Sequence, residues 1–247
     1  MARLLALLLA WLAATGAVAG EVRVAASSNL VGVIERITVA FRRDTGHELL
    51  VTTGATARLY EQVVKGAAYE VLLSADQEAP RRLEQQGLAR PGTRFTYATG
   101  KLVLWSAHDL PLNGHGEVLR QPPLGRLAIA DPRDSPYGAA AMEALRHLGV
   151  LEAWQPFLLV VPSVSQAHQL TAGGRAALGL IALSQVAEDG RIVRGSGWIV
   201  PPSLYPPLEQ DAVLLNAGAR NPAAIAFLAY LRGNAARAIL RAAGYGI

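Results

Sequence analysis

Four strand-like runs of apolar residues in this chain each end in small residues that carry hydroxyl or amide groups, and a helical pattern follows directly. The four junctions are Ala26-Ser27-Ser28-Asn29, Thr52-Thr53-Gly54-Ala55-Thr56, Asp134-Ser135-Pro136-Tyr137-Gly138 and Pro162-Ser163-Val164-Ser165. The start of a helix presents unpaired backbone N–H groups and the positive end of the helix dipole. Several helix starts that meet in one cleft can hold a small oxyanion without a full counter-charge.

The order of strands and helices predicts an α/β protein with two lobes. In the first half, strands at 22–26, 48–52 and 71–73 alternate with helical patterns, and in the second half strands at 127–130, 158–161 and 178–182 do the same. Such alternation is typical of a mostly parallel sheet with helices on its faces. We therefore expect a two-lobe fold of the periplasmic binding protein type, in which each lobe is a mostly parallel sheet flanked by helices.

Two segments of the chain are predicted to cross between these lobes. Residues 96–101 continue a long strand-like run, and residues 205–210 follow a proline-rich stretch. We predict one lobe from residues 21–97 and 208–247, a second lobe from residues 98–207, and a hinge of two strands. Because ligands of open parallel sheets lie at the carboxyl ends of the strands, we expect the four junctions to face one another across this hinge.

The first 20 residues have the pattern of a secretory signal peptide. A basic start with Arg3 is followed by the apolar run 4–12 and by the Ala17-Val18-Ala19 motif, which predicts cleavage near Ala19 or Gly20. The apolar run is shorter than a membrane-spanning helix, which disfavours the alternative of an uncleaved anchor. We expect export to the periplasm, and the absence of cysteine from the sequence means that a core rather than disulfides stabilises the product.

Several classes of function lack their usual signals. The formal net charge of +4 comes from scattered basic residues, which fits solvated helix faces better than a nucleic-acid track. No two of the five histidines are spaced for a shared metal ion on a helix, and no phosphate-binding loop, dinucleotide fingerprint or nucleophile elbow is present. We therefore expect neither an enzyme nor a cofactor.

Four segments in this order resemble the periplasmic molybdate-binding component of ABC importers, across essentially the whole mature length. They are Ala25 to Leu30, Leu73-Ser74-Ala75-Asp76-Gln77, Asp131-Pro132 with Pro136-Tyr137-Gly138, and Gly179-Leu180-Ile181-Ala182. The resemblance implies a monomer that binds molybdate, and also tungstate, and docks on a membrane permease. It also implies an anion site made of Ser28, Asn29, Thr56 and the main-chain N–H groups of Tyr137 and Val164. A tyrosine of other members falls at Ala182, so its hydroxyl is absent here.

These residue types suit a deprotonated tetrahedral oxyanion, which accepts hydrogen bonds and donates none. Hydroxyl, amide and backbone N–H groups can all donate to it. The alternatives are a receptor for sulfate or another small oxyanion, an amino-acid receptor with an Arg–Asp pair, and a periplasmic enzyme that uses Asp76. For Asp76 itself we favour capping of the following helix, and for Arg58 a surface position over a clamp in the cleft.

Overall fold

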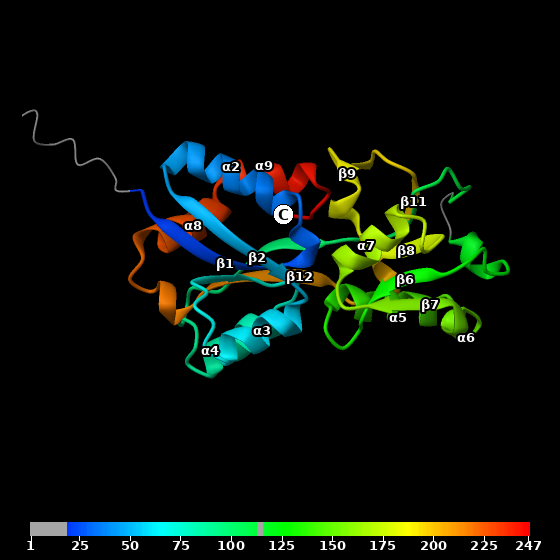
Figure 1. Cartoon of the computed structure of the whole chain (residues 1–247), viewed down its shortest axis with the longest axis horizontal. Coiled ribbons are helices and arrows are strands. Elements are labelled where there is room, and N and C mark those ends of the chain that lie inside the picture. The colour runs from blue at the N-terminus through cyan, green and yellow to red at the C-terminus, as the bar shows by residue number, and fades with distance from the viewer. Residues whose placement is uncertain (1–18, 113–115) are drawn as a thin grey trace, which may run out of the picture.

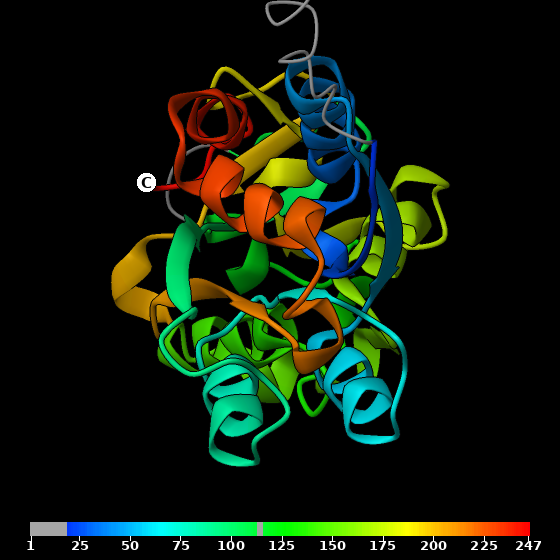
Figure 2. The same cartoon turned by 90° about the vertical axis from the view of Figure 1, so that its left-hand side faces the viewer.

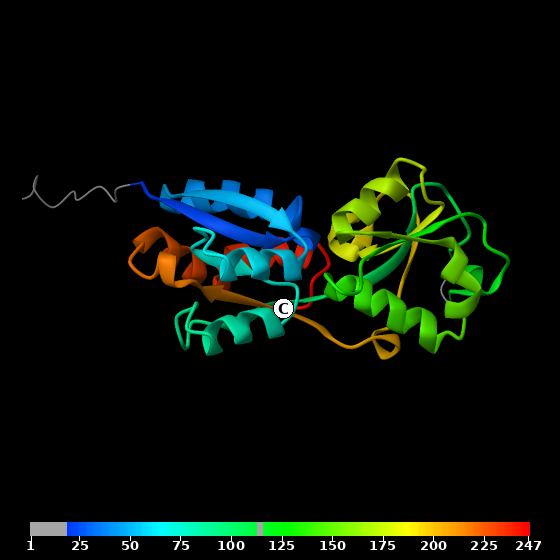
Figure 3. The same cartoon turned by 60° about the horizontal axis from the view of Figure 1, so that its bottom comes forward.

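The computed structural model describes residues 19–112 and 116–247 of the 247-residue chain. Of the predicted signal peptide, residues 1–18 lie outside the described part of the chain and residues 19 and 20 lie within it. His115 also lies outside the described part. Two α/β lobes lie side by side in Figures 1 and 3.

The first lobe is built on a five-stranded sheet with the order β2-β1-β3-β12-β4. Its strands are β1 (Glu21–Ser27), β2 (Glu48–Gly54), β3 (Val71–Leu73), β4 (Phe95–Gly100) and β12 (Leu208–Leu214). Helices α2 (Val33–Thr45), α8 (Pro222–Arg232) and α9 (Asn234–Ala242) cover one face, and α3 (Thr56–Val64) and α4 (Glu78–Gln85) cover the other (Figure 2). Helices therefore cover both faces of this sheet, although its edge strand β2 keeps several exposed residues, Leu50 among them.

The second lobe repeats this plan with the strand order β11-β5-β8-β6-β7. Its strands are β5 (Leu102–Ser106), β6 (Leu127–Ala130), β7 (Leu158–Val161), β8 (Leu178–Ala182) and β11 (Ser196–Ile199). Its helices are α5 (Pro136–His147), α6 (Leu151–Trp154) and α7 (Val164–Ala172), and a small hairpin joins β9 (Ala187–Glu188) to β10 (Arg191–Ile192). The short 3-10 turns are η1 (Ser28–Leu30), η2 (Glu117–Arg120), η3 (Gln155–Phe157), η4 (Leu183–Gln185), η5 (Pro202–Leu204) and η6 (Asn216–Gly218).

The two-lobe α/β fold predicted from the sequence is confirmed, including its mostly parallel sheets. In the first sheet β1 pairs in parallel with β2 and β3, whereas β12 is antiparallel to β3 and β4. In the second sheet β6 is parallel to β7 and β8, whereas β5 is antiparallel to β8 and β11. In each sheet four of the five strands therefore run in one direction, as predicted for a mostly parallel sheet, and the reversed strand is β12 in the first sheet and β5 in the second.

The chain passes from the first sheet to the second between β4 and β5, with Lys101 between them, and it returns from β11 to β12 (Figure 3). Strand β4 continues to Gly100, beyond the predicted lobe boundary at residues 97 and 98, whereas β12 begins at residue 208. The C-terminal segment comes back to this crossover, because Thr99 and Gly246 bond to each other through their main chains. The division into lobes by residue number stays a prediction.

Each lobe has its own hydrophobic core. In the first lobe Phe41 of α2 is fully buried and packs edge-on against Phe227 and Tyr230 of α8, with ring centroids 5.2 Å apart in both pairs. In the second lobe Trp154 is buried, and its Nε1 donates to the main-chain oxygen of Leu119 at 2.7 Å. Because the cores are separate, residues at the strand ends make the contacts between the lobes.

No single helix in residues 19–112 and 116–247 is long and apolar enough to cross a membrane. The nearest case is the pair of α8 and α9, which is bent by 59° and whose apolar residues belong to the core of the first lobe.

Replacement of the core residue Phe41 by alanine is expected to lower the free energy of unfolding by about 3–5 kcal/mol, because it removes a large buried ring and leaves a cavity. Urea denaturation followed by circular dichroism measures this change. The control is Val39→Ala on the same helix, at a side chain that is 60% exposed, for which we expect a change within about 0.5 kcal/mol. Equal effects of the two substitutions would contradict the packing described here.

Candidate functional site

The four predicted junctions meet where the two lobes face each other. The first two precede η1 and α3 of the first lobe, and the last two precede α5 and α7 of the second. All five residues predicted from the sequence are buried, with exposed fractions of 5% for Ser28, 3% for Thr56 and 1% for Asn29, Tyr137 and Val164. Helix α7, which follows the fourth junction, packs against η1, which follows the first.

Hydrogen bonds also join the junctions to one another. The hydroxyls of Ser27 and Thr56 lie 2.7 Å apart and link the first two junctions. The N–H of Ala57 donates to the main-chain oxygen of Asp134 at 3.1 Å and links the second to the third across the lobes. The Ser184 hydroxyl of the second lobe donates to the main-chain oxygen of Asn29 at 2.8 Å. The structure is therefore a closed form.

Donors without protein acceptors gather at these helix starts. The N–H groups of Tyr137 and Val164 lie in the first turns of α5 and α7, and neither has an acceptor among the residues that the structure describes. The Ser28 hydroxyl likewise has no hydrogen-bond partner within residues 19–112 and 116–247. Thr56 Oγ1 accepts from the N–H of Ala75 at 3.4 Å, and where it also accepts from Ser27, its own hydrogen is free to donate.

The local sequence explains why these N–H groups are available. Pro136 opens α5, has no N–H of its own and presets the backbone dihedral for a helix. Gly138 lies so close to β6 that a Cβ there would stand 2.3 Å from the Ala130 oxygen, so a larger residue would push α5 away. At α7 the Ser163 hydroxyl caps the helix by accepting from the N–H of Gln166.

The carboxylates near the third junction are paired with arginines. Asp131 accepts two bonds from the Arg133 guanidinium, at 3.0 and 2.7 Å, and this hydrogen bonding lowers the pKa of Asp131 to about 2. Asp134 pairs with Arg58 of the opposite lobe at 2.9 Å. Arg58 is 58% exposed, as predicted for a surface residue, yet it bridges the rim of the cleft. A cavity of about 340 Å³ lies at this rim, with Thr56 and Ala57 on one wall and Asp134 and Pro136 on the other.

Asp76 has the helix-capping contacts predicted for it. Its Oδ1 accepts from the N–H of Ala79 in the first turn of α4 and from the Ser74 hydroxyl, both at 2.9 Å. Burial raises the pKa of the Asp76 carboxyl above its usual range, although both hydrogen bonds oppose this shift.

Sequence reasoning missed a set of buried polar residues beneath the helix starts. Asn29 contacts Gln210 of β12 and Tyr245 near the C-terminus, and Gln210 in turn contacts Tyr97 of β4 and the Tyr137 phenol. Burial raises the pKa values of the three tyrosines, for Tyr245 to about 12, so their hydroxyls stay protonated at neutral pH. These residues are isolated in the sequence and form no motif, so no pattern predicts that they meet. The position of Tyr97 and Gln210 in the predicted crossovers was the one sequence feature that placed them near the site.

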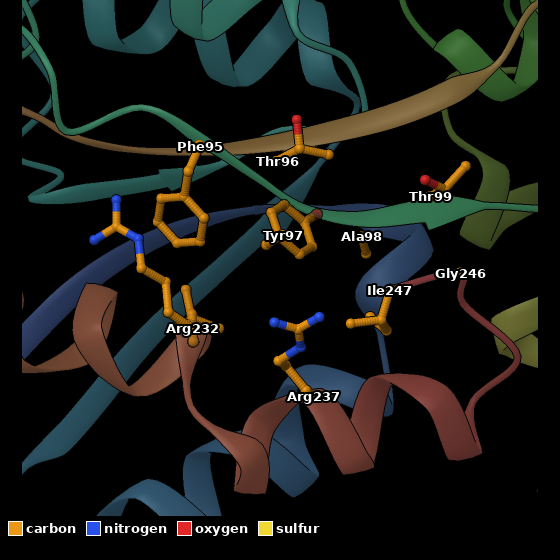
Figure 4. Close-up of a pocket in the computed structure, with 10 residues that line it drawn as sticks. Phe95, Thr96, Tyr97, Ala98, Thr99, Arg232, Arg237, Gly246 and Ile247 are labelled. Carbon is orange, nitrogen blue, oxygen red and sulfur yellow. The ribbon is translucent and has the colours of Figure 1, made fainter.

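A second hollow of about 120 Å³ lies on the side of the first sheet that α8 and α9 cover (Figure 4). The Arg232 guanidinium stacks over the Phe95 ring there at 3.8 Å, and the Arg237 side chain extends toward β4. None of its lining residues comes from the four junctions. Among residues 19–112 and 116–247 no group of three or more His, Asp or Glu residues is placed to hold a metal ion.

Two lobes that enclose a site at their strand ends define the class of solute-binding proteins. The family model described as bacterial extracellular solute-binding protein matches residues 22–246, and this chain belongs to that family. Across all of its 247 residues the chain is 45% identical to the molybdate-binding protein ModA of Azotobacter vinelandii, covering 98% of that protein. It is 44% identical to ModA of Rhodobacter capsulatus over 93% of this chain and 89% of the relative.

Solved structures give the same picture. The periplasmic molybdate-binding protein of Azotobacter vinelandii superimposes with a TM-score of 0.88 at 39% identity, covering 92% of this chain and 99% of that one. The sulfate-binding protein SubI of Mycobacterium tuberculosis, at 15% identity and a TM-score of 0.70, covers 92% of this chain and 86% of its own and shares the fold.

The Asp76→Asn variant is expected to gain stability relative to the wild type as the pH rises from below 3.8 to 7. The folded wild type holds the Asp76 proton more tightly than the unfolded chain does, so it loses stability as the pH rises through this window. Asparagine keeps the Oδ1 acceptor for Ala79 and has no proton to lose. Urea denaturation at several pH values measures the difference.

The control for this series is Asp109→Asn, a change at an exposed aspartate. We expect it to show no comparable trend with pH. A stability difference for Asp76→Asn that is flat or falls with rising pH would contradict the assignment.

Proposed function

We propose that this protein captures molybdate, and also tungstate, between its two lobes in the periplasm and delivers the anion to the membrane permease of an ABC importer. The observation that carries the proposal is the meeting of uncharged donors from both lobes in a buried site. The names of the relatives at 45% and 44% identity support molybdate as the anion.

The proposed ligands are those predicted from the sequence. Ser28 and Thr56 supply hydroxyls, Asn29 supplies its amide, and Tyr137 and Val164 supply main-chain N–H groups at the starts of α5 and α7. Hydrogen bonds to a charged acceptor contribute about 1.5–3 kcal/mol each, and each helix dipole adds about 0.3–1 kcal/mol. Several such bonds together give the submicromolar affinity that a scavenger needs.

Uncharged donors also explain selectivity by protonation state. A protonated oxyanion carries a hydroxyl hydrogen that needs an acceptor, and the proposed ligand atoms donate. The binding of such a species would leave that hydrogen unpaired in a buried site, which is unfavourable. The site therefore favours oxyanions that are fully deprotonated at neutral pH.

The proposed molecule is a monomer that acts by binding and needs no cofactor. Its signal peptide is cleaved near Ala19 or Gly20, so that the mature form begins near Gly20 or Glu21. The sulfate receptor is the competing function, since the donors would suit any tetrahedral dianion and only the size of the site separates the two. The capping contacts of Asp76 favour a structural role for this carboxylate over a catalytic one.

Isothermal titration calorimetry with molybdate, tungstate, sulfate, phosphate and an amino acid tests the proposed function. We expect submicromolar binding of molybdate and tungstate, and no competition from sulfate at equal concentration. Sulfate that competes equally would replace molybdate as the proposed ligand. Turnover of a substrate that Asp76→Ala abolishes would favour the enzyme instead.

The Arg58→Ala variant is expected to bind molybdate about two- to fivefold more weakly, because it removes an ion pair across the rim of the closed cleft. Stopped-flow measurement of ligand release should show a faster dissociation rate with little change in association. The control is Arg81→Ala, at an exposed arginine whose partner Glu78 lies on its own helix. Equal release rates for Arg58→Ala and the control would contradict a role of this pair in closure.

A further inference from the structure

The side-chain amide of Asn29 is oriented unfavourably for an anion. Its Nδ2 donates to Gln210 Oε1 at 2.9 Å and to Tyr245 Oη at 2.7 Å. Its Oδ1 is buried and has no hydrogen-bond partner among the residues that the structure describes. In this orientation both amide hydrogens are used within the protein, and an unpaired acceptor oxygen remains beside the proposed anion site.

The neighbouring amide of Gln210 is also poorly matched to its surroundings. Its Oε1 faces the Tyr97 hydroxyl at 2.9 Å, but that hydroxyl faces the main-chain oxygen of Ser74 at 3.0 Å as well. One hydrogen therefore serves two acceptors. The Gln210 Nε2 donates to Tyr137 Oη at 3.1 Å, and the hydrogen of this buried phenol has no acceptor in the described part of the chain.

Turning both amides over removes the shared Tyr97 hydrogen and the unused Tyr137 hydrogen, and it gives Asn29 Oδ1 partners within the protein. The nitrogen and oxygen of an amide exchange places in such a turn, so the heavy-atom distances remain those given above. Gln210 Nε2 then donates to Asn29 Oδ1 and to Tyr97 Oη, and the Tyr97 hydroxyl donates to Ser74 alone. Tyr137 Oη donates to Gln210 Oε1. Tyr245 Oη donates to Asn29 Oδ1 in place of its bond to the Asn29 main-chain oxygen at 3.2 Å, and that oxygen keeps the bond from the Ser184 hydroxyl.

We propose that Gln210 is a positioning residue, which holds the Asn29 amide with Nδ2 toward the bound oxyanion through a bond from Gln210 Nε2 to Asn29 Oδ1. This inference rests on the proposed function, because it assigns the Asn29 amide its role in anion binding. Nδ2 then stands where the one buried Asn29 atom without a partner stood, so the anion receives a donor there. The Asn29 main-chain oxygen gives up the Tyr245 hydroxyl but still accepts from Ser184.

The position of Gln210 connects this donor to closure of the lobes. Gln210 lies on β12 and Tyr97 lies on β4, the strands that border the two crossovers, and Figure 4 shows Tyr97 on β4. Tyr137, by contrast, belongs to α5 of the second lobe. The complete set of partners exists only while the lobes are closed, so closure itself favours the amide orientation that binds the anion.

A double-mutant cycle with calorimetry tests the inference. Gln210→Met keeps a similar length and removes the donor, and we expect it to weaken molybdate binding about tenfold. In an Asn29→Ala background the same change should weaken binding by less than about twofold, because Gln210 acts through Asn29. The control Glu209→Gln, at the exposed neighbouring residue on β12, should bind as the wild type does.

Nuclear magnetic resonance of the ¹⁵N-labelled wild type supplies a readout that does not depend on the folding of Gln210→Met. The Asn29 side-chain NH₂ signals, assigned by their loss in Asn29→Ala, should shift when molybdate is added. The inference is overturned if these signals stay in place, if Gln210→Met binds as tightly as the wild type, or if its loss is undiminished in the Asn29→Ala background. A wild type that binds no molybdate would instead reject the proposed function, and the inference with it.

Discussion

The contact between the strand ends of two separate sheets is the constraint on which the rest of this structure depends. Helix starts from both lobes meet at this contact, and the main-chain bond from Ala57 to Asp134 holds the two surfaces together. Buried polar groups need partners. A buried site with many donors and few acceptors therefore needs an acceptor from outside the protein to complete its hydrogen bonds.

Charge is handled differently at the centre and at the rim of this site. The predicted ligand positions are neutral, whereas Arg58, Asp131, Arg133 and Asp134 form ion pairs around the edge. Exposed ion pairs contribute little to stability by themselves. Asp134 nevertheless connects the two lobes, because its side chain pairs with Arg58 and its main-chain oxygen accepts from the N–H of Ala57 in the opposite lobe. Neutral donors at the centre avoid the large penalty of a buried, unpaired cation when the site is empty.

Much of the fold could be predicted because its signals are local. The small residues before η1, α3, α5 and α7 mark helix starts through capping and turn chemistry, and a helix start does not depend on distant residues. The prediction of mostly parallel sheets did not identify which strand of each sheet is reversed, which the structure shows to be β12 and β5. Whether β12 lies parallel or antiparallel to β3 depends on the side from which the chain returns after passing through the other lobe, and no local pattern carries that information.

The sequence by itself determined which residue types are available to an anion: hydroxyls at Ser28 and Thr56, an amide at Asn29, and helix-start N–H groups at Tyr137 and Val164. Only the tertiary structure decided which of these groups are free. The Ser27 hydroxyl lies against Thr56, and the hydroxyls of Tyr97 and Tyr245 meet the Gln210 and Asn29 amides, over separations of up to 216 residues along the chain. A donor is available to a ligand only when no protein acceptor reaches it, and that depends on packing between segments that are distant in the sequence.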